Sequence, residues 1–166
     1  MRFDVRGHDM RLSGHVSSGL GRAHIFMAQP HYQDQFRAVL GNTAWPGTLN
    51  IKVSGDDLVK YVALRRHSGI DTPDLEVTIH DDVENVNLDN IESIRIRGFL
   101  REGRSFGGAT SFTSTISNKG ENERLPCSIL IPDLTRHVDV VEVIAIEFLR
   151  EHLNLKDGDL VNLEIN

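Results

Sequence analysis

The chain has 166 residues, is 39% hydrophobic and carries a formal net charge of −6. This apolar content is ordinary for a globular protein and the length suffices for one packed core, which excludes a wholly disordered chain. The acidic balance disfavours a general nucleic-acid binder, because such proteins need a basic face.

The first half of the chain predicts a hairpin, two helices and two strands. Residues 11–29 read as two short strands around a glycine turn at Gly19 and Gly21. Residues 31–41 have apolar side chains at helical spacing and end at a glycine. A Pro46-Gly47 turn leads into a strand from Thr48, and residues 55–67 predict a second helix. The run 75–79 predicts a strand, and the acidic stretch 80–90 predicts a solvated loop.

The second half predicts mostly strands. Residues 91–100 and 104–117 form a hairpin closed by the turn 101–104, and the apolar runs 125–131 and 140–146 follow. Residues 147–159 predict a short helix with a stop at Gly158, before a last strand over 159–165. Many short strands with tight turns and few helices predict a mainly β fold, a single Greek-key-like β-barrel.

Location and thiol chemistry follow from what the sequence contains. No apolar run is long enough to cross a membrane, and the first eleven residues are too polar for a signal peptide, so we expect a cytoplasmic protein without a membrane partner. The single cysteine, Cys127, lies in an apolar strand. We expect it to be a small buried core residue, in a reducing compartment. The eight histidines show no spacing typical of a zinc site.

Two stretches could bind an anion and a cation. In the turn at Gly19 and Gly21, backbone N–H groups could cradle phosphate oxygens, although such a turn is also found in plain hairpins. Thr48, Asn50 and Lys52 share one face of the predicted strand. The two oxygens could hold one Mg²⁺ and the ammonium could face phosphates, or the face could simply be solvated.

Glu142 is a carboxylate within an apolar strand. It therefore needs a partner, a ligand or a solvent-facing position.

Five segments together resemble the archaeal CTP-dependent riboflavin kinases: "SGLGRAHIFM", "YQDQFRAVLG", "WPGTLNIKV", "PDLTRH" and "VEVIAIEFLREHLNLKDGDLVNLEI". Their order and spacing match at both ends of the chain, whereas residues 53–97 match poorly and are longer. The resemblance implies one cradle-loop barrel domain over residues 1–166. It also implies transfer of a phosphoryl group from CTP to the 5′-hydroxyl of riboflavin, giving FMN and CDP.

The resemblance also assigns roles to individual residues. It implies Mg²⁺ as the cofactor, bound by Thr48 and Asn50, and flavin contacts from Thr135 and Glu142, with Glu142 also a candidate base. The implied nucleotide contacts are Gly19, Leu20, Gly21, Arg22, Ala23, His24, Glu147, Phe148, Leu149 and Arg150. The family commonly has an acidic residue and a glycine where this chain has Arg22 and Ala23, and a proline where it has Ile146.

CTP and riboflavin are thus the expected partners, with no nucleic acid and no obligate protein partner. Two alternatives remain open at this point: a DNA-binding barrel without enzymatic activity, since cradle-loop barrels also occur in transcription regulators, and a flavin or nucleotide binder without turnover.

Overall fold

A computed structural model describes residues 10–19, 23–70, 72, 75, 77–118, 123–135 and 137–166. The strands are β1 (Met10–Ser17), β2 (Leu49–Lys52), β3 (Ile94–Ile96), β4 (Phe99–Arg101), β5 (Arg104–Phe106), β6 (Ala109–Asn118), β7 (Leu125–Pro132), β8 (Val140–Ile144) and β9 (Leu160–Ile165). The helices are α1 (Ala23–Met27), α2 (Pro30–Leu40), α3 (Gly55–His67), α4 (Val77–Glu84) and α5 (Leu149–His152).

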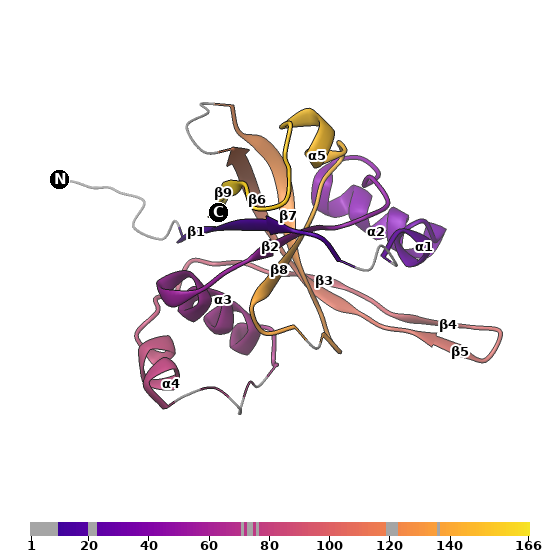
Figure 1. Ribbon diagram of the computed structural model, residues 1–166. Coiled ribbons are helices and arrows are strands. Elements are labelled where there is room, and N and C mark those ends of the chain that lie inside the picture. The colour runs from indigo at the N-terminus through magenta and orange to yellow at the C-terminus, as the bar shows by residue number, and fades with distance from the viewer. Residues whose placement is uncertain are drawn as a thin grey trace.

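A closed antiparallel barrel forms the centre of the molecule (Figure 1). Within the described residues, six strands follow the order β6-β7-β8-β2-β1-β9, and pairing of β6 with β9 closes the ring. One edge of strand β6 is long enough for two partners: residues 109–111 pair with β3, and residues 114–118 pair with β9, while the other edge pairs with β7. The expected mainly β barrel with a few short helices is confirmed.

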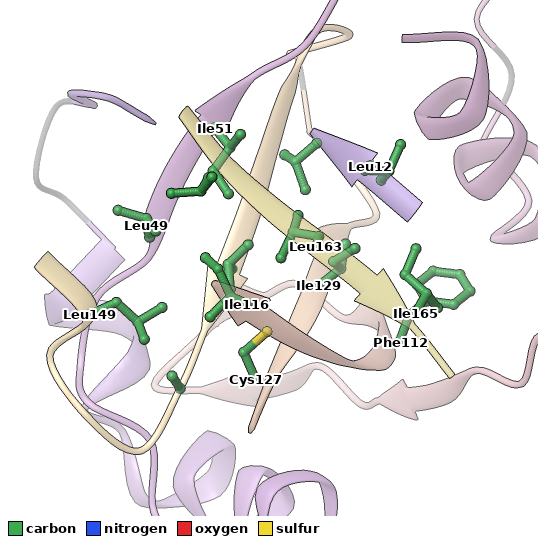
Figure 2. Packing of buried hydrophobic residues seen from close by; sticks show 14 of the residues in the cluster. Leu12, Leu49, Ile51, Phe112, Ile116, Cys127, Ile129, Leu149, Leu163 and Ile165 are labelled. Carbon is green, nitrogen blue, oxygen red and sulfur yellow. The ribbon is translucent and has the colours of Figure 1, made fainter. Parts of the chain in front are cut away.

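Alternate side chains from the six strands fill the barrel interior (Figure 2). Phe112, Ile116 and Leu163 are at most 1% exposed, and a fully buried side chain of this size contributes about 1.5–3 kcal/mol. Cys127 is also 1% exposed, and burial raises the pKa of its thiol. The prediction of an inert core cysteine is confirmed.

Helix α2 covers the outer face of one side of the barrel, as its spacing predicted. Phe36 is 2% exposed and belongs to a cluster with Ile96, Leu130 and Ile144, which come from three strands. The helix ends at Gly41, whose φ of 84° is accessible at little cost only to glycine. Because one face of β7 meets this cluster and the other meets the barrel core, most of that strand is buried.

The strand predicted over 75–79 is wrong, and the loop predicted over 80–90 is wrong for residues 80–84 and confirmed for residues 85–90. Instead of a strand and a loop, Val77–Glu84 form helix α4, which packs against α3. Ile79, Val83 and Val86 lie at helical spacing and meet Val62 and Ala63 of α3. The β-branched composition indicated a strand, but burial of this helical face outweighs the small differences in intrinsic propensity.

The hairpin of β4 and β5 projects from the barrel, as Figure 1 shows. Its turn is Glu102-Gly103, both at positive φ, in agreement with the predicted turn over 101–104. Phe99 and Phe106 stack at 4.6 Å between ring centroids, and Phe99 also contacts Tyr32 of α2 at 5.2 Å. These aromatic contacts fix the base of the hairpin against α2.

Candidate functional site

One row of side chains crosses four neighbouring strands on the outer face of the barrel. The strand registers align Leu130 of β7, Glu142 of β8, Asn50 of β2 and Ser17 of β1. Because Ile51 and Val141 next to them in the chain point into the core, these four side chains point outward. From β7 to β1, the row therefore presents an apolar side chain, a carboxyl group, an amide and a hydroxyl group.

Thr48 and Asn50 lie together at the start of β2, as the alternation predicted. The Thr48 hydroxyl donates to Asn50 Oδ1 at 3.1 Å, and both residues are half-buried. The preceding turn is fixed by the Trp45 N–H, which donates to the carbonyl of Ala145 at 2.8 Å. Lys52 lies at the far end of the strand and pairs with Asp139 at 3.5 Å, so it lines neither cavity described below.

Gly19 lies directly against this pair. A Cβ atom at Gly19 would overlap with Nδ2 of Asn50, so the missing side chain is what lets the amide occupy its place. Leu20, Gly21 and Arg22 lie outside the described residues, as does the side chain of His24.

The predicted second strand after the glycine turn is wrong, because Ala23–Met27 form helix α1. Ala23 and Met27 lie four residues apart and both join the cluster under α2. That helical spacing was the available signal, and its energetic benefit depends on a partner helix elsewhere in the chain.

An apolar cavity of about 280 Å³ lies between the barrel face and helices α1 and α2. Phe26, Tyr32 and Phe36 form an aromatic wall, and Thr48 and Glu142 are polar groups on the barrel side. The Tyr32 hydroxyl donates to the carbonyl of Gly107 at 2.6 Å, joining the wall to the segment after β5. A largely apolar cavity with few polar groups is typical of a site for a small organic ligand.

Glu142 is the charged group of this cavity. Burial raises the pKa of its carboxyl to about 7. Within the described part of the chain, its carboxyl group makes no side-chain hydrogen bond or ion pair. A carboxyl that titrates near neutral pH inside a cavity is a candidate for contact with a ligand or for proton transfer.

A second, smaller cavity of about 80 Å³ lies on the other side of Thr48. Glu147, Phe148, Leu149 and Arg150, which the sequence singled out as one segment, all line it. Thr48 is therefore the wall shared by the two cavities.

Trp45 and Phe148 form an aromatic pair that the sequence did not predict. Their rings stack at 4.7 Å between centroids with 18° between planes, and they are 45% and 39% exposed. Both line the small cavity and an adjoining open one of about 440 Å³. Because the two residues lie 103 positions apart in the chain, no local sequence pattern predicts their contact.

Arg150 ties α5 to the end of β1. Its Nη2 donates to Asp157 Oδ1 at 2.7 Å and to the Ser17 carbonyl at 3.2 Å. The Ser18 hydroxyl donates to the other Asp157 oxygen at 2.6 Å. This hydrogen bond and the Arg150 contact lower the pKa of Asp157. The network holds the residues just before Gly19 beside the 147–150 segment.

Thr135 lies in the connection between β7 and β8, where its N–H donates to the Pro132 carbonyl at 3.1 Å. Pro132 lines the apolar cavity, whereas Thr135 does not. The structure thus brings Thr48, Asn50, Gly19, Glu142 and the 147–150 segment together, and leaves Thr135 next to the group.

No group of three or more His, Cys, Asp or Glu side chains is arranged to hold a metal among the residues that the structure describes. Nor does any described helix have the length and apolar character needed to traverse a bilayer.

Comparison with known proteins assigns the chain to a family. The family model CTP-dep_RFKase, described as domain of unknown function DUF120, matches residues 16–80 and 72–165. A protein named riboflavin kinase from Thermoplasma acidophilum is 32% identical over 154 residues, 93% of this chain and 56% of that protein.

Proteins of the same name from Methanocorpusculum labreanum and Methanospirillum hungatei are 34% and 33% identical, over 96% and 98% of this chain. The chain spans 56–61% of the length of these three relatives. The chain belongs to the CTP-dependent riboflavin kinase family.

The half-buried carboxyl of Glu142 predicts a pH-dependent stability. A folded-state pKa of about 7, above the ordinary value of 4.5, means that the folded protein holds this proton more tightly than the unfolded chain. Stability should therefore fall as pH rises from about 4.5 to about 7, by up to about 3 kcal/mol from this group. Glu142→Gln should remove that part of the fall.

Denaturant unfolding of both proteins at pH 5 and pH 8 measures this difference. The wild type should lose more stability than the variant across the interval. Parallel losses in the two proteins would contradict a half-buried, uncompensated Glu142.

Proposed function

We propose that this chain transfers the terminal phosphoryl group of CTP to the 5′-hydroxyl of riboflavin, giving FMN and CDP. The observation that carries the proposal is Thr48, which lines both the apolar cavity and the cavity of the 147–150 segment. An acceptor in one cavity and a donor in the other would meet at this residue. The relatives' name and the family label support the choice of substrates.

The apolar cavity suits the flavin. Its aromatic wall of Phe26, Tyr32 and Phe36 can pack against a fused ring system. Glu142 faces the same space and is assigned to flavin contact, with Thr135 contributing from the neighbouring connection. The expulsion of water by such walls favours phosphoryl transfer over hydrolysis.

The opposite cavity suits the nucleotide. Glu147, Phe148, Leu149 and Arg150 line it, and Arg150 is joined through Asp157 to Ser18, directly before the glycine segment. We assign the donor to this segment together with Gly19, Leu20, Gly21, Arg22, Ala23 and His24. The nucleotide's phosphates would then lie between the segment and Thr48.

A divalent ion, which we propose is Mg²⁺, fits Thr48 and Asn50. Their side-chain oxygens are 3.1 Å apart, close to the separation of about 3.0 Å between neighbouring ligands of an octahedral ion with 2.1 Å bonds. Neutral ligands are adequate because the phosphates supply the negative charge. When bound, the ion would neutralise charge on those phosphates.

The chain's own residues then have limited chemistry to do, because phosphoryl transfer depends mainly on positioning and charge neutralisation. The 5′-oxygen of riboflavin bonds to the terminal phosphorus as the bond to the bridging oxygen breaks, and CDP leaves with that electron pair. The hydroxyl proton passes to Glu142 or to solvent. A carboxyl with a pKa of about 7 is partly ionised at neutral pH and can accept it.

Incubation with riboflavin, Mg²⁺ and each nucleoside triphosphate tests the proposal, with FMN separated by chromatography. FMN should form, and CTP should support it better than ATP. A site that hydrogen-bonds a pyrimidine leaves polar groups unpaired with a purine, and such losses discriminate strongly. Equal turnover with ATP would contradict CTP selection, and no FMN with any donor would contradict the proposed reaction.

Thr48 and Asn50 should behave as one unit. Thr48→Ala and Asn50→Ala should each lower turnover by about 100-fold or more, because either change misplaces the ion and the phosphates. The double variant should be little worse than the poorer single variant, since residues that act as one device are not additive. Raised Mg²⁺ should partly restore the single variants by mass action.

Turnover measured against Mg²⁺ concentration for the three variants decides this point. Small, additive losses of turnover without a response to Mg²⁺ would contradict a shared metal site and show that the two residues belong to an ordinary polar strand face. Unfolding curves serve as the control, because both side chains lie outside the barrel core and stability should change little.

Trp45 offers a direct probe of nucleotide binding, since it is the only tryptophan in the sequence. It lines the proposed nucleotide cavity and does not line the apolar one. Titration with CDP and Mg²⁺ should therefore change tryptophan emission saturably. Unchanged emission, with binding seen by calorimetry, would contradict the assignment of that cavity.

A further inference from the structure

Two arginines from other parts of the chain contact the connection between β7 and β8, at Asp133 and at His137. Arg65 comes from helix α3 and Arg95 from strand β3. Neither lines the cavities described above. Both reach the segment that joins Pro132, a wall residue of the apolar cavity, to β8.

Arg65 is an unusual residue because its charge is buried. It is 3% exposed, and within the described residues its guanidinium donates to two neutral oxygens, Thr72 Oγ1 at 3.2 Å and the His137 carbonyl at 2.9 Å. The Tyr61 ring lies 6.0 Å from it. A buried cation is costly, so a position that retains one calls for a role beyond filling space.

Arg95 forms an ion pair with Asp133 at the other end of the same connection. Its Nη1 donates to Asp133 Oδ1 at 2.6 Å and its Nη2 donates to the second carboxylate oxygen, so the pair is bidentate. The N–H of Asp133 also donates to the Gly108 carbonyl at 3.0 Å. A bidentate pair fixes orientation as well as distance, which a single contact does not.

The two contacts bracket Thr135. Asp133 lies two residues before it, and His137 lies two residues after it. Between them the chain turns through the hydrogen bond from the Thr135 N–H to the Pro132 carbonyl. Beyond His137, the Val53 N–H donates to the Asp139 carbonyl at 2.9 Å, directly before β8 begins.

We propose that Arg65 and Arg95 are positioning residues that hold the β7–β8 connection, and through it Pro132 in the wall of the apolar cavity, and so set the affinity for the flavin without touching it. This inference rests on the proposed function, because it takes riboflavin as the occupant of that cavity. It also gives helix α3, which lines neither cavity, a part in substrate binding.

The experiment measures KM for riboflavin and for CTP in Arg65→Met, Arg65→Lys and Arg95→Gln. Riboflavin KM should rise about tenfold in Arg65→Met and Arg95→Gln, while CTP KM stays within about twofold, because the nucleotide cavity is built from other segments. Arg65→Lys should recover part of the loss, since an ammonium can still reach one carbonyl. Quenching of riboflavin fluorescence gives the same ranking without turnover.

Two control variants separate positioning from general damage. Thr72→Val removes the Arg65 contact that lies outside the connection and should leave riboflavin KM within about twofold of the wild type. Arg124→Met removes a surface arginine that contacts Thr115 and Glu164 at the opposite end of β7, and should change neither KM. Unfolding curves establish that each variant is folded.

The outcomes are distinct. Unchanged riboflavin affinity in folded Arg65→Met and Arg95→Gln, or equal losses for riboflavin and CTP, would overturn the inference and leave the proposed function intact. If Arg65→Met does not fold, Arg95→Gln alone decides, because Arg95 is half-exposed. Failure of the wild type to bind riboflavin would overturn both.

Discussion

Closure of the barrel by the pairing of β6 with β9 decides which side chains are free for chemistry. Once the ring is closed, its interior is filled by alternate apolar residues, and every second residue must face outward. Asn50 and Glu142 are outward-facing for this reason, and the register between β2 and β8 makes them neighbours. A shift of β2 by one residue in that register would send Asn50 into the core and turn Ile51 outward.

The outer face becomes a site because two helices cover only part of it. Helices α1 and α2 bury the apolar end of the row around Leu130, and cover Glu142 only in part. Partial cover explains why this carboxyl is desolvated enough to titrate near neutral pH while it still faces a cavity. On the other side of Thr48, the cavity wall comes from the loop after β8, which carries polar and aromatic groups together.

The parts of the fold that sequence predicted are those set by local pattern. Alternation along 48–53 placed Thr48 and Asn50 on one face, and helical spacing ending at Gly41 defined α2. Helices α1 and α4 were missed because their short apolar faces gain stability only from contacts with other segments. The Trp45–Phe148 pair and the contact from Arg65 to the His137 carbonyl depend on residues more than 70 positions apart, which no local pattern encodes.

The buried thiol inside the barrel can be used to detect large motions of the chain. Cys127 is the only cysteine in the sequence, and its side chain points into the core formed by the six strands (Figure 2). A thiol reagent can reach it only when this core opens, so the labelling rate reports such openings. Movements of the β4–β5 hairpin, which contributes no residue to this core, should leave the labelling rate unchanged. Ligands that hold the outer face together would slow it.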